Sequence, residues 1–271
     1  MEPTLDAQVD RARDLLAGAG RVLVLTGAGI SAESGVPTFR GTQGLWRAQR
    51  PEDLATPEAF RRDPRLVWEW YAWRRDLVLG CRPNPGHRAL HRWLRARKGI
   101  AALATQNVDG LHARAASEES EANGPPDDPA LPYPLLELHG SLFRVRCTAC
   151  GREEPHTASV DATSLETLPR CAACGGLLRP AVVWFGEILP EAALSEAWAW
   201  AAAAEVALVV GTSALVHPAA SLPRATLERG GVVVEVNPQA SPLTPASAVS
   251  LRGPAGILLA KVLGTGEPTR V

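Results

Sequence analysis

Two absences narrow the possible functions before any motif is considered, and a third, that of lysine, is a compositional bias from which no function follows. Lysine is nearly missing, because only Lys98 and Lys261 occur and arginine supplies the other basic residues. Since 28 basic residues stand against 29 acidic ones, the formal net charge is −1, which argues against a general binder of nucleic acids or membrane surfaces. No apolar run approaches the roughly 18 residues that a membrane-spanning helix needs.

The N-terminus also lacks the features of a targeting signal. It reads MEPTLDAQVD, which is acidic and polar and therefore resembles neither a secretory nor a mitochondrial address. We expect a cytoplasmic protein that does not enter a membrane. The 271 residues, of which 46% are hydrophobic, suffice for one or two domains with a substantial core.

The most informative stretch is a glycine-rich turn that follows an apolar run. Arg21–Leu25, RVLVL, is typical of a buried parallel strand, and Gly27 and Gly29 follow it. Glycines at these positions make a tight turn and let backbone N–H groups approach a pyrophosphate. Ala32 stands where a third small residue would let a helix pack on the strand. Many glycine-rich turns bind nothing, so the continuation of the segment decides its interpretation.

The continuation differs from that of a dehydrogenase, which would enter an amphipathic helix here. Gly35 and Pro37 interrupt the helix and direct Phe39 and Arg40 back over the expected cofactor. In addition, no acidic residue stands at a second strand end about 20 residues after the glycines, where a dehydrogenase holds the ribose 2′-hydroxyl. Both observations disfavour hydride transfer.

Four of the five cysteines form two CxxC pairs, Cys147–Cys150 and Cys171–Cys174. Such pairs in a cytosolic protein indicate metal before disulfide. Four thiolates make a closed tetrahedral zinc site with no open position, so we predict a structural zinc ion. Gly151 and Gly175 follow the pairs and suit tight turns. A redox dithiol is the alternative, which the duplication disfavours, and the remaining Cys81 is expected to be buried and inert.

Strands that alternate with helices organise the rest of the chain. Apolar runs predict strands at Ile100–Ala104, Glu205–Val210 and Gly231–Val236, each followed by Thr, Gly or Asn. The alternation predicts an α/β fold, a Rossmann-like doubly wound parallel sheet with an inserted zinc-binding module. Ligands of such sheets bind beyond the carboxyl ends of the strands. The acidic, proline-rich segment Ser117–Pro134 reads as a solvated loop.

Several polar residues after the predicted strands could carry chemistry. His139 could act as a general base, since an imidazole takes up a proton near neutral pH, although a histidine at a strand end more often fills space. Asn107 and Asp109 offer the amide and carboxylate groups that a nicotinamide carboxamide needs, although ordinary turns also place Asn and Asp there. His112 reads as structural.

The segment GAGISAESGVPTFRG resembles the cofactor loop of the sirtuins, the NAD-dependent protein-lysine deacylases. Further motifs agree with this resemblance from about Val22 to Gly256, among them QNVD at 106–109 and HG at 139–140. The division that the resemblance implies is a Rossmann-like NAD-binding domain at 1–45, 82–140 and 181–271, a helical acyl-pocket segment at 46–81, and a zinc-binding module at 141–180 that forms one wall of the substrate cleft.

The resemblance implies that NAD is consumed as a co-substrate. The acyl-lysine carbonyl oxygen attacks the nicotinamide ribose and nicotinamide leaves. His139 is the implied catalytic base, which deprotonates a ribose hydroxyl, and the acyl group ends on ADP-ribose while lysine is freed. The implied partners are acylated lysine side chains of proteins, with no direct contact to nucleic acid, and we expect a monomer.

Most of the positions that match the NAD-binding residues of the family lie in the glycine-rich loop or at strand ends. They are Gly27, Ala28, Gly29, Ser31, Ala32, Glu33, Pro37, Thr38, Phe39, Arg40, Trp46, Gln106, Asn107, Val108, Asp109, Gly211, Thr212, Ser213, Asn237, Pro238, Gln239 and Ala255. The segment that matches the family's peptide-docking strand contributes Val182, Val183, Phe185 and Gly186.

Tyr71 and Arg74 lie three residues apart on a predicted helix and so share a face. A guanidinium can bind a carboxylate bidentately while a phenol adds a third hydrogen bond. The pair resembles the YxxR motif of class III sirtuins, which binds the distal carboxylate of succinyl-, malonyl- or glutaryl-lysine. Ala55 matches the small residue that widens the acyl pocket there. Merely solvated arginines are the alternative, and Arg75 is a competing candidate for the carboxylate.

Two other classes of protein stay open at the level of the sequence. One is an NAD-dependent oxidoreductase, which would use the same glycine-rich turn. The other is a zinc-ribbon module that binds nucleic acid, against which the near-neutral charge and the intact catalytic motifs speak.

Overall fold

The computed structural model describes residues 3–37, 50–123 and 131–264. Six parallel strands form its main sheet in the order β3–β2–β1–β7–β8–β9. Their bounds are Val22–Thr26 (β1), Ala101–Thr105 (β2), Leu135–Glu137 (β3), Val206–Val210 (β7), Val232–Val236 (β8) and Val249–Leu251 (β9). The strand order reverses between β1 and β7, which is the doubly wound topology that the sequence predicts.

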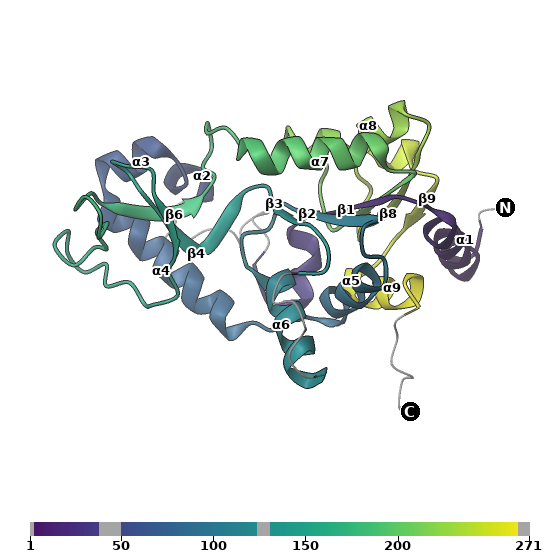
Figure 1. The fold of residues 1–271 in the computed structure, drawn as a ribbon, viewed down its shortest axis with the longest axis horizontal. Helices are drawn as coiled ribbons and strands as arrows, with labels where there is room; N and C mark the ends of the chain where they lie inside the picture. The colour runs from purple at the N-terminus through teal and green to yellow at the C-terminus, as the bar shows by residue number, and fades with distance from the viewer. Residues whose placement is uncertain (1–2, 38–49, 124–130, 265–271) are drawn as a thin grey trace.

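Helices cover both faces of the main sheet (Figure 1). One face carries α7 (Glu191–Ala203) and α8 (Leu222–Glu228), and the other carries α1 (Leu5–Gly18), α5 (Pro85–Ala96) and α9 (Ala255–Val262). Successive side chains of a strand point to opposite faces, so Val22 and Val24 join one core cluster while Leu23 and Leu25 join the other. Burial on both faces explains why the strands read as continuous apolar runs.

A second, three-stranded antiparallel sheet has the order β5–β4–β6, with bounds Glu153–Pro155, Gly140–Cys147 and Leu178–Val182. It packs against three helices at one end of the molecule (Figure 1), which are α2 (Pro51–Leu54), α3 (Pro57–Arg62) and α4 (Pro64–Gly80). The indole Nε1 of Trp68 on α4 donates to the main-chain oxygen of Leu178 at 2.9 Å. We call these two layers, α2–α4 and β4–β6, the small lobe.

Prolines begin all three helices of the small lobe. Pro51, Pro57 and Pro64 each stand at the first turn of a helix, where the missing N–H costs nothing. The carboxylate of Asp63 accepts from the N–H of Leu66 at 2.9 Å and thereby caps α4.

The prediction that 117–134 is a solvated loop is wrong for its first part. Helix α6 spans Leu111–Asn123, and two of its acidic side chains pair with arginines of α5. Arg92 contacts Glu119 at 2.7 Å and Arg88 contacts Glu118 at 3.0 Å. The sequence predicts solvated acidic residues here because their arginine partners lie more than 25 positions earlier in the chain.

Two short elements, helix α8 and strand β9, are not predicted from the sequence, because each is too short to show a clear pattern. No helix in the described part of the chain is long and apolar enough to cross a membrane.

Candidate active site

The glycine-rich turn after β1 is built by contact with the turn after β7. The N–H groups of Gly27 and Gly29 donate to the main-chain oxygens of Val210 and Gly211 at 3.0 and 2.7 Å. A Cβ atom on Gly29 would lie 2.6 Å from the Cα of Gly211, which no side chain tolerates. Glycine is therefore required here so that two strand ends can touch at the topological switch point, where a dinucleotide binds in such sheets.

The segment after this turn is not an α-helix, and the role expected of Ala32 in helix packing is wrong. The chain winds instead into two short 3₁₀ turns, Ala28–Ile30 and Ala32–Ser34, and reverses at Gly35 with φ of 85°. Ala32 is exposed, because no helix continues from it onto the strand. The predicted interruption by Gly35 is confirmed, since a positive φ favours glycine.

The strand ends of β2, β7 and β8 bring three predicted cofactor-binding residues together. The side-chain amide of Gln106 donates to the hydroxyl of Thr212 at 3.1 Å, and that of Asn237 donates to the Thr212 main-chain oxygen at 3.2 Å. Of their neighbours, Ser213 is half-buried while Pro238 and Gln239 are exposed. The carboxyl edge of the sheet therefore presents a polar row beside the glycine turns, which fits the two halves of a dinucleotide.

A buried polar network joins the glycine-rich loop to the QNVD segment. The hydroxyl of Ser31 donates to the carboxylate of Asp109 at 2.7 Å. The amide of Asn107 donates to the Ser31 hydroxyl at 3.1 Å and to the main-chain oxygen of Gly27 at 3.2 Å. Burial raises the pKa of Asp109. The three residues thus form one preorganised unit.

Two buried histidines lie beside this network. His87 Nε2 lies 3.4 Å from the Ser31 hydroxyl, and His112 Nε2 lies 3.0 Å from the hydroxyl of Thr26. Burial lowers the pKa of both histidines, that of His112 to about 4, so both are neutral at neutral pH. This placement agrees with the structural interpretation of His112. The sequence assigns no role to His87, because its packing against Ser31 depends on tertiary contact.

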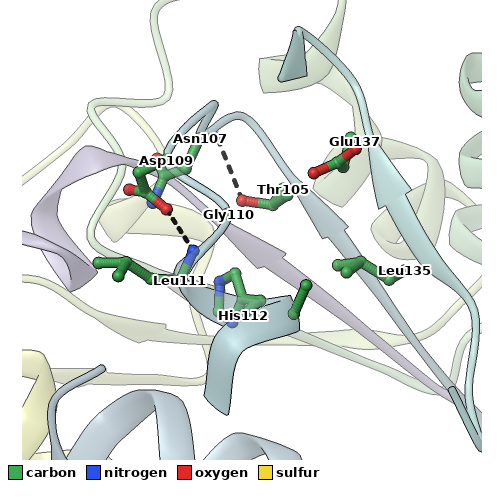
Figure 2. Close-up of a pocket in the computed structure, with 9 residues that line it drawn as sticks. Thr105, Asn107, Asp109, Gly110, Leu111, His112, Leu135 and Glu137 are labelled. Carbon is green, nitrogen blue, oxygen red and sulfur yellow. Dashed lines mark hydrogen bonds between the residues drawn. The ribbon is translucent and has the colours of Figure 1, made fainter. Parts of the chain in front are cut away.

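A small pocket opens at the carboxyl ends of β2 and β3, beside this network (Figure 2). Its lining residues are Thr105, Asn107, Asp109, Gly110, Leu111, His112, Ala113, Leu135 and Glu137. Figure 2 shows the Asp109 carboxylate accepting from the Leu111 N–H, at 2.9 Å. Two predicted nicotinamide-binding residues, Asn107 and Asp109, therefore border a cavity and are also held by hydrogen bonds.

The predicted base, His139, is oriented by the segment that carries the QNVD motif. Its Nδ1 lies 2.9 Å from the main-chain oxygen of Gln106. A carbonyl oxygen only accepts, so Nδ1 carries the hydrogen and Nε2 is the nitrogen left to take up a proton. Burial lowers the pKa of His139. The ring is therefore neutral, and so competent as a base, at neutral pH.

The remaining residues that are predicted to bind the cofactor lie in different surroundings. The carboxylate of Glu33 accepts from the N–H of Gly256 at 2.6 Å and so caps α9 next to buried Ala255. Val108 and Pro37 are half-buried, as is Ala28 in the first 3₁₀ turn. The predictions for Thr38, Phe39, Arg40 and Trp46 lie outside the described residues.

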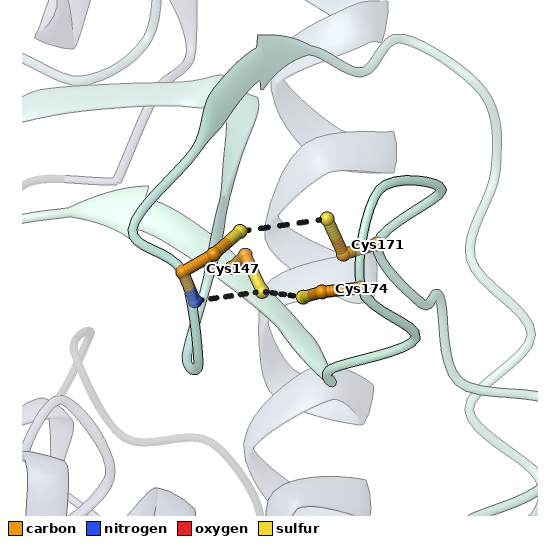
Figure 3. Close-up of side chains that lie close together, drawn as sticks. Cys147, Cys171 and Cys174 are labelled. Atoms are coloured by element: carbon orange, nitrogen blue, oxygen red, sulfur yellow. Dashed lines mark hydrogen bonds between the residues drawn. The ribbon is translucent and has the colours of Figure 1, made fainter.

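The four paired cysteines converge on one point in the small lobe (Figure 3). Their sulfur atoms all lie within 4.8 Å of one another, with 3.4 Å between Cys147 and Cys174 and 3.8 Å between Cys150 and Cys171. Zinc–sulfur bonds of about 2.3 Å in a tetrahedron require sulfurs about 3.8 Å apart. The four thiols therefore fit a structural zinc ion.

The turns around the cysteines also follow the sequence prediction. Gly151 and Gly175 both have φ of 73°, a conformation that favours glycine. A Cβ atom on Gly176 would lie 2.9 Å from the sulfur of Cys147, so this position, too, requires glycine.

The predicted acyl-pocket residues gather on one wall of the small lobe. The main-chain oxygen of Ala55 accepts from the N–H of Phe185 at 2.9 Å, which joins α2 to the peptide-docking segment. The indole Nε1 of Trp184 donates to the hydroxyl of Tyr71 at 2.8 Å. The Arg74 guanidinium stacks 5.6 Å from the centre of the Tyr71 ring. We call Ala55, Tyr71, Arg74 and Trp184 the acyl wall.

The competing candidate, Arg75, points away from the acyl wall. It is 3% exposed, and its Nη2 donates to the main-chain oxygens of His156 and Ala158 at 2.5 and 2.9 Å. Arg75 therefore ties α4 to the loop after β5. Of the two neighbouring arginines, only Arg74 lies against Tyr71.

Comparison with known proteins identifies the family. A family model described as Sir2 family matches residues 27–218. The chain belongs to the Sir2 family. The NAD-dependent protein deacylase of Pyrococcus furiosus is 49% identical over 251 residues, which are 92% of this chain and 94% of the relative. An NAD-dependent protein deacylase of Thermus thermophilus is 50% identical over 248 residues, 90% of each chain.

Solved Sir2 structures resemble the whole chain. A Sir2 homologue in complex with NAD has a TM-score of 0.83 at 44% identity, over 94% of this chain and 93% of its own. A mutant Sir2 homologue in complex with 2′-O-acetyl ADP ribose has the same TM-score and identity, over 94% and 95%. The resemblance drawn from the sequence motifs is thereby confirmed.

Within this Sir2 chain, sequence reasoning missed three residues that the geometry connects to the acyl wall. Trp184 lies inside the predicted docking segment but was given no role. Arg179 and Glu187 form a largely buried ion pair beside it, at 2.5 Å. An indole between apolar residues predicts only a buried side chain. The sequence therefore gives no indication that Trp184 forms a hydrogen bond with Tyr71.

Proposed function

We propose that this Sir2-family chain, an NAD-dependent protein deacylase, removes succinyl, malonyl and glutaryl groups as well as acetyl groups from protein lysines. One water would be consumed, and the products would be nicotinamide, O-acyl-ADP-ribose and free lysine. The observation that carries the proposal is the position of Tyr71 and Arg74 together on the acyl wall, next to the main-chain contact of Ala55. The deacylase names of the relatives and the acetyl ADP ribose complex of a Sir2 homologue support the reaction class.

The ionisation of the pair suits a carboxylate ligand. Burial lowers the pKa of Arg74 to about 10, which still leaves the guanidinium charged at neutral pH. Burial raises the pKa of Tyr71, so the phenol keeps the hydrogen that it can donate. A carboxylate only accepts hydrogen bonds, and these bonds are strong because donor or acceptor is charged.

The carboxyl edge of the sheet would perform the chemistry common to every acyl group. NAD, when bound, supplies the electrophilic ribose carbon and the hydroxyl that receives the acyl group. His139 would take the hydroxyl proton at Nε2, since Nδ1 is occupied by the Gln106 oxygen. Ser31, Asn107 and Asp109, which are tied together by hydrogen bonds, would orient the nicotinamide end without reorganisation.

The substrate peptide would dock along Val182–Gly186. Val182 ends strand β6 and Val183 follows it, while Phe185 is 53% exposed. Backbone pairing of this kind gives affinity with little sequence selectivity. The acyl group, more than the peptide, would therefore decide the choice of substrate, and zinc would keep the small lobe folded.

The test compares one peptide carrying acetyl-, malonyl-, succinyl- or glutaryl-lysine, with nicotinamide release as the readout. Arg74→Met should lower kcat/KM for the three carboxylated chains by about 10- to 100-fold, the effect of losing a hydrogen bond to a charged group. Deacetylation should fall far less, because acetyl has no distal carboxylate. Equal losses for all four acyl groups would contradict the clamp.

Arg75→Met is the matched control, since it removes a neighbouring guanidinium of the same helix that binds His156 and Ala158 instead. It should lower stability but leave the ratio of succinyl to acetyl turnover unchanged.

A further inference from the structure

The hydroxyl of Tyr71 has a buried partner that constrains its direction. Trp184 Nε1 donates to this oxygen at 2.8 Å, and Tyr71 and Trp184 are 0% and 2% exposed. An indole N–H can only donate, so the phenol oxygen must accept from it. The single phenol hydrogen then has to point away from the indole. Within residues 3–37, 50–123 and 131–264, the structure shows no acceptor for this hydrogen.

The indole itself is held rigidly on two sides. The Arg179 guanidinium lies 3.4 Å above the Trp184 ring centre, and the Phe60 ring packs 5.3 Å from it. Arg179 donates to both carboxylate oxygens of Glu187, at 2.5 and 2.9 Å. Glu187 in turn accepts from the main-chain N–H of Trp184 at 2.8 Å.

This arrangement fixes both the plane of the indole and the position of its backbone. Stacking of a guanidinium on an indole sets the ring plane. The bidentate pair of Arg179 and Glu187 closes the turn in which Trp184 lies. The direction of the indole N–H, and with it the direction of the Tyr71 hydrogen, is therefore set before any substrate arrives.

We propose that Trp184, held in place by Arg179 and Glu187, is a specificity-determining residue that makes the Tyr71 hydroxyl act only as a donor. The acyl wall then selects chains that end in a carboxylate over chains of the same shape that end in a neutral carboxamide. A carboxylate offers acceptors alone, whereas a carboxamide brings two N–H donors that this wall does not accept. The inference rests on the proposed function, because it assigns a cause to the selectivity of its clamp.

The kinetic test uses two peptides, one with succinyl-lysine and one with its monoamide, the succinamoyl-lysine. The native enzyme should strongly prefer the carboxylate. In Trp184→Phe the Tyr71 hydroxyl can turn and accept from the amide, so the ratio of the two kcat/KM values should fall by about tenfold, the typical effect of one hydrogen bond. Glu187→Gln weakens the ion pair that holds Arg179. It should therefore lower the same ratio of kcat/KM values, but by a smaller factor.

Trp68→Phe is the matched control. Trp68 is also buried, lies on α4 near Tyr71 in sequence, and loses an equivalent indole hydrogen bond, to the Leu178 oxygen. Its ratio of carboxylate to amide turnover should equal that of the native enzyme, because its N–H does not contact Tyr71.

A spectroscopic test reads the hydrogen bond without turnover. The chain contains two tyrosines, Tyr71 and Tyr133, so incorporation of 3-fluorotyrosine gives two ¹⁹F resonances, which Tyr133→Phe assigns. The Tyr71 resonance should move in Trp184→Phe and stay in place in Trp68→Phe. Equal shifts in both variants would overturn the assigned hydrogen bond.

The outcomes separate the two proposals. If the native enzyme does not turn over succinyl-lysine, the acyl clamp of the proposed function fails and the inference fails with it. If the native enzyme does so but Trp184→Phe keeps the native ratio of carboxylate to amide, the clamp stands and only the role of Trp184 is overturned.

Discussion

The carboxyl edge of the main sheet and the acyl wall of the small lobe both bury polar side chains, but they do so differently. At the sheet edge, Ser31, Asn107 and Asp109 satisfy one another by hydrogen bonds. On the acyl wall, Tyr71 and Arg74 bring an O–H and a guanidinium against aromatic rings, with Trp184 as a further donor. The first region pairs its donors with its own acceptors, and the second holds a guanidinium and a phenol, which are groups that can donate to a carboxylate.

This difference separates what is common to the reaction from what selects the substrate. A buried network whose members satisfy one another is rigid, which suits a unit that holds the same co-substrate in every turnover. The guanidinium and the phenol hydrogen of the acyl wall can both donate to the carboxylate of an acyl chain. Changes at the sheet edge should therefore affect all acyl groups alike, whereas changes on the acyl wall should affect the carboxylated ones.

The largest effect is expected from His139→Tyr. Loss of a general base typically costs 10²- to 10⁴-fold in rate, and here the loss should be the same for acetyl and succinyl substrates. Steady-state nicotinamide release measures both, and bound zinc, determined on the same preparation, should stay at the native level. A variant that lost only one of the two activities would place His139 with the acyl wall instead.

Cys171→Ser should unfold the small lobe while the main sheet stays ordered. Structural zinc contributes on the order of 10 kcal/mol in small modules, and Cys171 is one of four thiols that fit the ion. Amide hydrogen exchange should show loss of protection in β4 and β6 but not in β1 and β7. Uniform loss across both sheets would show that the two regions fold as one unit.

Gly29→Ala should destabilise the sheet edge by about 1–3 kcal/mol, the cost of overpacking. The added Cβ would lie 2.6 Å from the Cα of Gly211, where neither backbone can move without breaking the turn. Gly18→Ala is the control, since nothing lies within 4 Å of its added Cβ, and it should keep or raise stability. Urea unfolding of both variants measures the difference, and equal midpoints would contradict the contact.

The smallest expected effect is the pH dependence. Burial holds the pKa of His139 below its usual 6.5, and the base must be neutral to act. The value of kcat/KM should therefore be level near neutral pH and fall only as the pH drops through a value below 6.5. Acetyl and succinyl substrates should share this acidic limb, because it arises at the sheet edge. Limbs that differed between the two substrates would argue against a common base.

The sequence predicts the sheet edge far better than the acyl wall. Strands β1, β2, β7 and β8 are buried on both faces, so their apolar runs are visible in the sequence alone. The residues that follow them, such as Asn107 and Thr212, must then gather at one edge. The paired cysteines are equally readable, because their spacing encodes the geometry of the metal.

The acyl wall depends on contacts that no local pattern encodes. Trp184 lies 113 positions after Tyr71, and a single indole hydrogen bond produces no periodic pattern in the sequence. Arg74 and Arg75 are chemically identical in the sequence, and only the packing of α4 against the loop after β5 distinguishes them. The helical form of 117–123 was missed for the same reason, since the arginines of α5 that pair with it are distant in the chain.

The central claim, that the protein transfers a carboxylated acyl group from lysine to NAD-derived ADP-ribose, has a direct test. The purified enzyme is incubated with NAD and a succinyl-lysine peptide, and the products are quantified by mass spectrometry. We predict equal amounts of nicotinamide, free-lysine peptide and succinyl-ADP-ribose. Release of free succinate with NAD left intact, or formation of NADH, would contradict it.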